Sequence, residues 1–121
     1  MIEIKRVSKV YRLKDREVVA VDDVSLTIED GDIYGIIGYS GAGKSTLVRL
    51  INQLEVQDSG KIFIDGQDLG NLSQIELRKL RTKVGMIFQH FNLLMQKNVL
   101  ENVCFPLYIQ GKSKKDAKKR A

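Results

Sequence analysis

The sequence of 121 residues contains one cysteine, one proline and no tryptophan. A single cysteine excludes an intrachain disulfide, which fits a cytosolic protein, and Cys104 is expected to pack as a small apolar residue in a helix. Long apolar runs are missing as well. The longest uncharged stretches, residues 33–43 and 84–96, fall far short of the roughly 20 apolar residues that cross a bilayer. Any role at a membrane is therefore expected to be peripheral.

Excess charge of one sign is also missing from most of the chain. The net charge is +5, but residues 112–121 hold six basic residues and one acidic residue, and the remaining basic and acidic residues are equal in number. Proteins that follow a phosphate backbone usually spread basic residues over a whole face. The pattern therefore favours a solvated helix, and a patch for nucleic acid or anionic lipid is the alternative.

The distribution of apolar residues predicts strands in several places. Apolar and polar residues largely alternate in residues 19–28, which is typical of strands with one buried face. Residues 33–37 and 84–88 are short apolar runs, typical of strands that are buried on both faces of a parallel sheet. Residues 61–65 predict a further strand, with Asp65-Gly66 as its turn.

Helical spacing and a capping signal predict two helices. Leucine and isoleucine recur three or four residues apart in residues 47–54, directly after a glycine-rich segment. Ser73 and Glu76 have the spacing of a capping box. A second helix is therefore expected to start at this point and to end near Thr82.

Two more helices are expected near the C-terminal end. Residues 97–110 are predicted to be helical in part, with an interruption at Pro106, because proline removes a backbone donor and clashes with the preceding turn. Ser113 and Asp116 form a weaker capping signal for a last, short helix.

Residues 38–45 match the phosphate-binding pattern G-x-x-x-x-G-K-[ST] and lie between a predicted strand and a predicted helix. Glycine lets the main chain curl its N–H groups around phosphate oxygens, and the following helix turns its positive end toward the same anion. A chance match in a chain of this size is below about one per cent, given glycine at about 7% of residues. A dinucleotide site of the G-x-G-x-x-G kind is disfavoured, because Thr46 occupies the position of the third glycine.

The side chains of this loop have separate expected roles. Lys44 can bridge the outer phosphates, Ser45 can hold Mg²⁺, and Thr46 can add a hydroxyl near the inner phosphate. The residues expected to bind the nucleotide are Gly38, Tyr39, Ser40, Gly41, Ala42, Gly43, Lys44, Ser45 and Thr46.

Several segments together resemble the ATP-binding subunit of ABC transporters. The segment Gly41-Ala42-Gly43-Lys44-Ser45-Thr46-Leu47 is preceded by Val21-Asp22-Asp23-Val24-Ser25-Leu26 and followed by Ser59-Gly60-Lys61-Ile62. The segment from Gly85 to Leu94, Gly-Met-Ile-Phe-Gln-His-Phe-Asn-Leu-Leu, is similar to the Q-loop segment of the methionine importers. The resemblance covers essentially the whole chain but only the first part of a full-length subunit.

This resemblance implies an α/β fold with a P-loop NTPase core, in which a parallel sheet carries an antiparallel β edge. Residues 1–88 would form the N-terminal part of the nucleotide-binding core. Residues 89–121 would form the Q-loop and the start of a helical subdomain. The chain is expected to be truncated before the signature and Walker B segments, and therefore to expose apolar sheet surface and to be poorly stable.

The resemblance also assigns roles to single residues. Tyr11 falls at the position that stacks on adenine, with an ordinary strand aromatic as the alternative. Gln89 falls at the Q-loop glutamine, which reaches Mg²⁺ and the γ-phosphate, so Lys44 and Gln89 would be catalytic and Ser45 and Gln89 would be metal ligands. Tyr39 departs from the proline of many relatives, and phosphate binding is expected to tolerate it.

Apolar residues after Gln89 are the third implied feature. They would line or border a groove that receives a coupling helix of the membrane subunit, or else belong to the core. The residues are Phe91, Leu93, Leu94 and Met95.

The implied activity is that of an importer ATPase subunit that uses ATP and Mg²⁺ to drive uptake of a solute, methionine. The implied partners are an integral-membrane permease and, in the intact protein, a second copy of the subunit, at the cytoplasmic face of the membrane; nucleic acid is not an expected partner. Residues 18–23 imitate a Walker B strand but lie before the glycine-rich loop, and His90 is not preceded by the strand that carries the family's switch histidine.

Other functions stay open on the residues alone. A catalytically inactive nucleotide-binding fragment or module is the first alternative, because no signature, Walker B aspartate, catalytic glutamate or switch histidine follows Gln89. A GTPase or kinase is disfavoured by the absence of an Asn-Lys-x-Asp motif. A basic nucleic-acid or membrane binder depends on the C-terminal tail alone.

Overall fold

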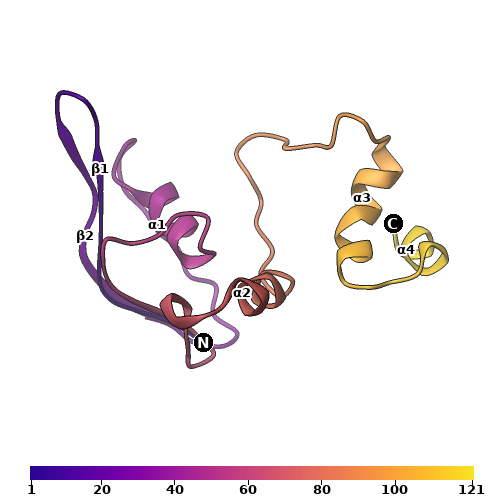
Figure 1. The fold of residues 1–121 in the computed structure, drawn as a ribbon, viewed down its shortest axis with the longest axis horizontal. Coiled ribbons are helices and arrows are strands. Elements are labelled where there is room, and N and C mark those ends of the chain that lie inside the picture. The colour runs from indigo at the N-terminus through magenta and orange to yellow at the C-terminus, as the bar shows by residue number, and fades with distance from the viewer. The chain divides into compact units, whose positions relative to one another are not determined.

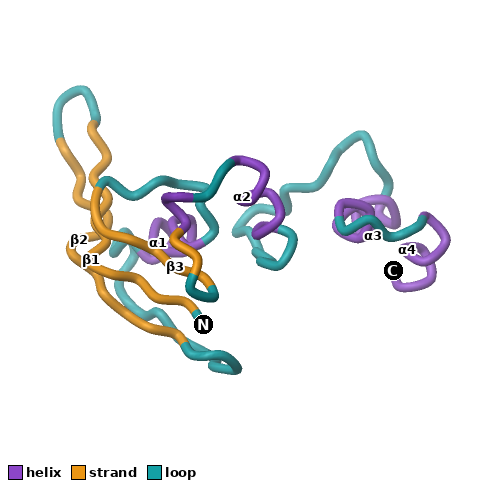
Figure 2. The backbone as a smooth tube through the Cα atoms, turned by 60° about the horizontal axis from the view of Figure 1, so that its bottom comes forward, coloured by secondary structure: helices purple, strands orange, loops and turns teal.

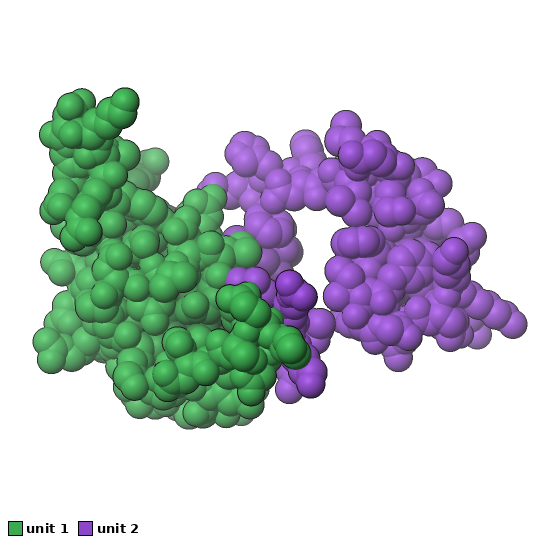
Figure 3. Space-filling model, in the orientation of Figure 1, with its two compact units in different colours: residues 1–77 green, residues 78–121 purple.

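The computed structural model describes residues 1–121, and the contacts within the chain divide it into two units, Met1–Leu77 and Arg78–Ala121. Figure 3 shows the two units in separate colours. The first unit contains the β-sheet and the glycine-rich loop, and the second contains the last two helices. None of the helices has the length and apolar content that crossing a membrane requires.

A four-stranded antiparallel sheet organises the first unit, with the strand order β2-β1-β3-β4. Strand β1 (Ile2–Arg12) pairs with β2 (Glu17–Ile28) on one side and with β3 (Ser59–Ile64) on the other. The short strand β4 (Gln67–Asp68) pairs with β3. Figure 1 shows β1 and β2 as a long hairpin, and Figure 2 shows the strands in orange. Strand β2, which contains the predicted residues 19–28, therefore forms an edge of the sheet.

The hydrophobic core of this unit is made by the sheet and the first helix. Helix α1 spans Lys44–Ile51, so it ends before Leu54, the last position of the predicted helical spacing, and it buries Leu47 and Leu50. Strand β1 contributes Ile4 and Val7, which are 2% and 0% exposed. Burying a side chain of this size stabilises the fold by about 1.5–3 kcal/mol. Strand β1, which pairs with a neighbour on each side, therefore forms a main part of the core.

The predicted buried strands at residues 33–37 and 84–88 are not formed. Ile33, Ile37 and Ile87 are fully or almost fully exposed. A strand is stable only when a neighbour accepts and donates its main-chain hydrogen bonds. Every pairing in this sheet is antiparallel, and neither segment takes part in one. The antiparallel edge of the predicted sheet is present, and the exposure of these isoleucines agrees with the expected exposed apolar surface.

Local signals between β3 and α2 are confirmed. Asp65 and Gly66 have φ values of 51° and 77°, as a two-residue hairpin between β3 and β4 requires. Helix α2 spans Gln74–Arg81. Before it, the Ser73 N–H donates to Glu76 Oε2 at 2.8 Å and the Glu76 N–H donates to Ser73 Oγ at 3.3 Å, so the predicted capping box is formed.

The second unit contains α3 (Val99–Ile109) and α4 (Lys114–Arg120). The prediction that Pro106 interrupts the helix is wrong, because α3 continues through it. Proline removes one main-chain donor, but a helix can accommodate it, and α3 remains helical beyond Pro106 as far as Ile109. The Asp116 N–H donates to Ser113 Oγ at 3.1 Å, which confirms the cap of α4. Cys104 is fully buried in α3, as predicted.

Asp68 links β3 to the 3₁₀ helix η1 (Leu69–Asn71). It accepts hydrogen bonds from Lys61 Nζ and from the Gly70 N–H, both at 3.0 Å, and its side chain is 14% exposed. The bond from Lys61, followed by the bond from Gly70, lowers the pKa of Asp68 below its ordinary value of 3.8 despite some desolvation. The ionised carboxylate therefore holds this corner of the sheet together.

We predict that the Asp68→Asn variant is less stable by about 1 kcal/mol at pH 7, because it loses a charge-assisted hydrogen bond. A carboxyl group whose pKa is lower in the folded state contributes stability above its ordinary pKa, and that stability is lost as the pH falls through the folded pKa. Urea denaturation between pH 2 and 7 should therefore show a smaller loss of stability below about pH 4 in the variant than in the parent chain. Asp15→Asn, in an exposed turn, is the control; equal pH profiles for parent and Asp68→Asn contradict the assignment.

Candidate nucleotide-binding site

The glycine-rich loop leads directly into the N-terminus of α1. Gly43 is the N-cap of this helix and has a φ of 81°, and Gly41 has the same φ. Positive φ values of this kind favour glycine, because a side chain would clash with the main chain. No side chain caps the helix. Its first N–H groups are therefore left for a ligand, as in an anion site at a helix start.

Strand β2 is the support on which this loop lies. A Cβ atom added to Gly43 would be 1.8 Å from the carbonyl oxygen of Ala20. The β1–β2 pairing is irregular at the same place, since Lys9 pairs with Val21 while Val10 pairs with Val19. Ala20 is thus the extra residue of a bulge, and bulges commonly redirect a strand next to a functional site. Gly43 is needed both for its φ and for this close approach.

Lys44 is the first residue of α1, and its side chain returns over the loop. Its Nζ atom donates to the carbonyl oxygens of Gly38 and Tyr39, both at 2.7 Å. The Ala42 N–H also donates to the Tyr39 carbonyl, at 3.1 Å, which closes the turn. Because carbonyl groups carry no formal charge, the ammonium group keeps its positive charge for an anion bound at the loop.

A cavity of about 280 Å³ lies beside the loop. Its size is near the lower end of the range for small-molecule sites. It joins the predicted adenine-stacking residue of β1 to the predicted phosphate-binding loop, although more than 25 residues separate them in the sequence. The lining residues are Tyr11, Val18, Ala20, Gly41, Ala42, Gly43, Lys44, Ser45 and Thr46.

A larger cavity of about 550 Å³ lies next to the first one, between β2 and the segment 34–37. Apart from the loop residues, its walls are mostly apolar, with Val24, Leu26 and Ile36 among them. It lacks the hydroxyl groups of Ser45 and Thr46 and the ring of Tyr11, all of which line the smaller cavity. The smaller cavity therefore has the chemistry expected of a nucleotide site.

Metal binding by protein side chains alone is not supported anywhere in the chain. No group of three or more His, Cys, Asp or Glu side chains is placed to hold a metal ion. Mg²⁺ in phosphate sites is usually held by one or two side chains, phosphate oxygens and water. The hydroxyl of Ser45 lines the cavity at the start of α1, so the residues present fit an ion that arrives with a triphosphate.

Gln89 belongs to the second unit, as does His90, in a segment without helix or strand. The glycine-rich loop belongs to the first unit, so the role of Gln89 at Mg²⁺ stays a prediction. Among the apolar residues that follow, Phe91, Leu93 and Met95 are 94%, 57% and 88% exposed. They are not core residues in this structure, which leaves their assignment to a docking groove as a prediction.

Asn102 of α3 is a residue whose role the sequence did not indicate. Its Oδ1 accepts from the Leu94 N–H at 2.8 Å, and its Nδ2 donates to the carbonyl oxygens of Leu94, Lys97 and Asn98 at 3.2, 3.1 and 3.0 Å. One amide side chain thus fixes the segment that follows Gln89 to the start of α3. The only signal in the sequence was an asparagine near the start of a helix, and this signal does not identify the hydrogen-bond partners of its side chain.

Comparison with known proteins gives similarities along the whole chain. The family model described as ABC transporter matches residues 21–121. The chain is 54% identical over 121 residues to the methionine import ATP-binding protein MetN of Staphylococcus saprophyticus, covering all of this chain and 36% of that protein. It is 59% identical to MetN 2 of Lactiplantibacillus plantarum and covers 35% of that protein. The chain thus spans about a third of the length of these relatives.

Two solved structures of ABC cassettes are similar to the chain in fold. One is the dimeric structure of a post-hydrolysis state of the ATP-binding cassette MJ0796 bound to ADP and Pi, with a TM-score of 0.91 and 35% identity over 99% of this chain and 53% of that chain. A second dimeric structure of MJ0796, a bacterial ABC transporter cassette, has a TM-score of 0.92 and 36% identity over the same shares. The predicted α/β fold with a P-loop NTPase core is confirmed.

We predict that Gly43→Ala is much more damaging than Gly41→Ala. Both variants place a side chain at a φ of 81°, which costs about 1–3 kcal/mol. Only the Cβ at position 43 also meets the Ala20 carbonyl, whereas position 41 has open space around it. The two variants are compared by urea denaturation and by titration with an ATP analogue. Equal losses of stability and affinity contradict the assigned contact between the loop and β2.

Proposed function

The chain belongs to the ABC transporter family, and from this we propose that it binds Mg²⁺-ATP in the cavity between Tyr11 and residues 41–46, as the N-terminal portion of an importer ATPase subunit. The observation that carries the proposal is that one cavity is lined by Tyr11 of β1, by the glycine-rich loop, and by Ser45 and Thr46, whose side chains carry hydroxyl groups. An aromatic ring suits a base, and main-chain N–H groups at a helix start suit phosphates.

The phosphates are bound by the loop and by the start of α1. The first N–H groups of α1 and the positive end of the helix attract the anion, and Lys44 exchanges its two carbonyl partners for phosphate oxygens. Ser45 contributes its hydroxyl to Mg²⁺, and Thr46 contributes a hydroxyl to the inner phosphate. When bound, Mg²⁺ would neutralise part of the negative charge of the phosphates.

The base is bound by Tyr11. The ring stands on β1 opposite Val18 of β2, and both residues line the cavity. Stacking of a base on an aromatic ring contributes roughly 1–3 kcal/mol. Phosphate binding and base binding are therefore supplied by different elements of the sheet.

The physiological role we propose is methionine import. It is supported by identities of 54% and 59% to proteins named as methionine import ATP-binding proteins. In the intact protein, two copies of the subunit would act with an integral-membrane permease at the cytoplasmic face of the membrane, and Gln89 would contact Mg²⁺ and the γ-phosphate side. The dimeric structures of the similar cassette support the pairing of two copies.

A second candidate is a nucleotide-binding chain that does not turn over ATP. Phosphoryl transfer to water needs a group that orients the attacking water and an extra charge or donor at the γ-phosphate. The 121 residues supply the phosphate-binding loop but contain no signature motif and no Walker B aspartate with its catalytic glutamate. We therefore expect these residues alone to bind ATP without appreciable hydrolysis.

We predict that two substitutions affect the binding of ATP and of tripolyphosphate differently. Lys44→Ala should weaken binding of both ATP and tripolyphosphate by about 10–100-fold, because a charge-assisted bond is worth about 1.5–3 kcal/mol. Tyr11→Ala should weaken ATP binding by about 5–100-fold and leave tripolyphosphate binding unchanged, since it removes only the base contact. Calorimetric titration measures both ligands. Tyr11→Phe, which keeps the ring, and Lys83→Ala, on the exposed surface, are the controls. If both test variants bind like the parent, the site is assigned wrongly.

Hydrolysis is tested separately on the purified 121-residue chain. A coupled phosphate-release assay with Mg²⁺-ATP should give no rate above that of Lys44→Ala. The physical reason is that the site lacks the group that orients the attacking water. Robust hydrolysis that Lys44→Ala abolishes contradicts this expectation while leaving the binding proposal intact.

A further inference from the structure

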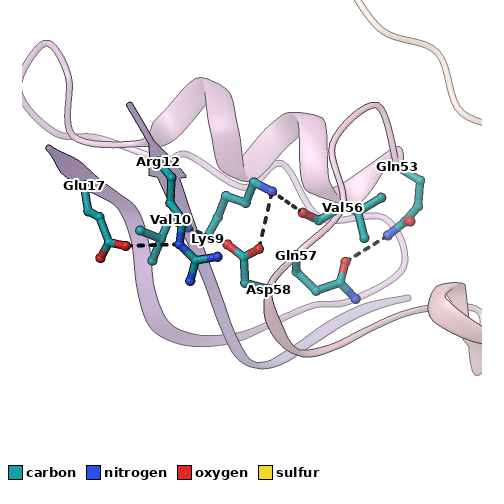
Figure 4. Close-up of polar contacts among 8 residues, drawn as sticks. All are labelled: Lys9, Val10, Arg12, Glu17, Gln53, Val56, Gln57 and Asp58. Carbon is teal, nitrogen blue, oxygen red and sulfur yellow. Dashed lines mark hydrogen bonds and ion pairs between the residues drawn. The ribbon is translucent and has the colours of Figure 1, made fainter. Parts of the chain in front are cut away.

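The segment just before β3 forms a second support for β1. Strand β3 pairs with β1 only as far as the pair Ser8 and Ser59. Beyond Ser8, Val56 and Asp58 contact β1 on this side, and we call residues 56–58 the 56–58 clamp. Figure 4 shows the clamp residues with Lys9 and Val10 of β1 and with Gln53.

Asp58 holds the main chain of β1 on both sides of Lys9. Its N–H donates to the Ser8 carbonyl at 2.9 Å, and its Oδ2 accepts from the Val10 N–H at 2.7 Å. The bond from Val10, followed by the charges of Lys9 and Arg12, lowers the pKa of Asp58 below 3.8. An ionised carboxylate therefore takes the place of the missing strand partner.

Lys9 connects the clamp to the aromatic ring of the candidate site. Its Nζ donates to the Val56 carbonyl at 2.7 Å and lies 3.7 Å from Asp58 Oδ1. The same Nζ atom lies 5.5 Å from the centroid of the Tyr11 ring, within the range of a cation–π contact. The Lys9 side chain is only 15% exposed and does not line the cavity. It can therefore affect a ligand only through Tyr11.

The clamp is needed at this place because the other side of β1 is irregular. The pairing with β2 shifts between Lys9 and Val10, at the Ala20 bulge. Tyr11 follows directly after this shift, near the outer end of a two-stranded hairpin, where an isolated pair of strands is only marginally stable. Without the clamp, the position of the Tyr11 ring would depend on the hairpin alone.

The clamp is also linked, through Gln53, to the helix that starts at the phosphate site. Gln53 Nε2 donates to Gln57 Oε1 at 3.2 Å, and the Gln53 N–H donates to the Leu50 carbonyl at the end of α1 at 3.1 Å. The same three-residue segment therefore contacts the strand that carries Tyr11 and is linked through Gln53 to the end of the helix that begins at the glycine-rich loop.

We propose that Lys9 and Asp58 are positioning residues for base recognition: together they hold the Tyr11 ring at the wall of the cavity, so that they set the preference for a nucleotide over a bare triphosphate. This inference rests on the proposed function, because it takes the cavity to be the nucleotide site. The ion pair and the two main-chain hydrogen bonds of Asp58 fix the strand, and the Lys9 ammonium group fixes the ring.

The experiment compares affinities for ATP and for tripolyphosphate in the 121-residue chain and its variants. The quantity measured is the ratio of the two affinities, which a general loss of folding does not change selectively. Lys9→Met should lower ATP affinity by about 3-fold and leave tripolyphosphate affinity unchanged, because a cation–π contact at a partly exposed site is worth roughly 0.5–1 kcal/mol. Lys9→Arg keeps the cation and should preserve the ratio. Asp58→Ala should lower the ratio at least as much as Lys9→Met.

Lys5→Met is the matched control. Lys5 lies on the same strand and its Nζ atom lies 4.7 Å from the centroid of the Phe63 ring, so it loses the same kind of contact away from the cavity. Its ratio should equal that of the parent chain. A ratio that falls equally in Lys5→Met and Lys9→Met overturns the inference.

Two further outcomes separate this inference from the proposed function. If Tyr11→Ala lowers the ratio and neither Lys9→Met nor Asp58→Ala does, the nucleotide site stands and the positioning role is wrong. If the parent chain itself binds ATP no better than tripolyphosphate, the base-binding part of the proposed function fails, and the inference fails with it. Equal losses for both ligands in Lys9→Met show a purely structural role and also overturn the inference.

Discussion

The contact between Gly43 and the carbonyl oxygen of Ala20 is the constraint on which the candidate site depends. It joins the start of α1 to the edge strand of the sheet at a distance that no other residue at position 43 allows. Because Ala20 is the bulged residue of β2, the sheet presents a main-chain carbonyl there instead of a regular ladder. The loop, the helix start and the wall with Tyr11 then face one cavity. A regular strand or a bulkier residue at this point would move the loop away from the ring.

Features that depend on a few neighbouring residues were predicted well from the sequence. The Asp65-Gly66 turn and the caps at Ser73 and Ser113 are each decided by chemistry within three or four residues. The helix after the glycine-rich loop follows from its apolar spacing for the same reason. Pro106 was misjudged because a proline can either end a helix or be accommodated within it, and the residue type alone does not decide between the two.

Features that depend on distant partners were predicted less well. Residues 33–37 and 84–88 have the composition of buried strands, but a strand also needs a neighbour to receive its hydrogen bonds, and no pairing in this sheet supplies one. For the site, the glycine-rich loop has a strong local signature, and Tyr11 was placed through the family resemblance. Asp58 and Asn102 were missed because their roles are hydrogen bonds to main-chain atoms, which have no signature in the sequence. Lys9 was missed because its side-chain partners, Tyr11 and Asp58, are identified only by the fold.

The way in which the site is supported explains how phosphate and base recognition can vary independently. The loop is held by Ala20 of β2 on one side, while Tyr11 is held by the 56–58 clamp on the other side of β1. A change in the clamp therefore moves the ring without altering the φ angles of the loop glycines. A change at Gly43 disturbs the loop but leaves the hydrogen bonds of Asp58 to β1 in place. Both supports meet β1 or β2 where the pairing of the two strands is irregular. This irregularity lets one hairpin serve two kinds of recognition, because each side of the hairpin is fixed by a different neighbour.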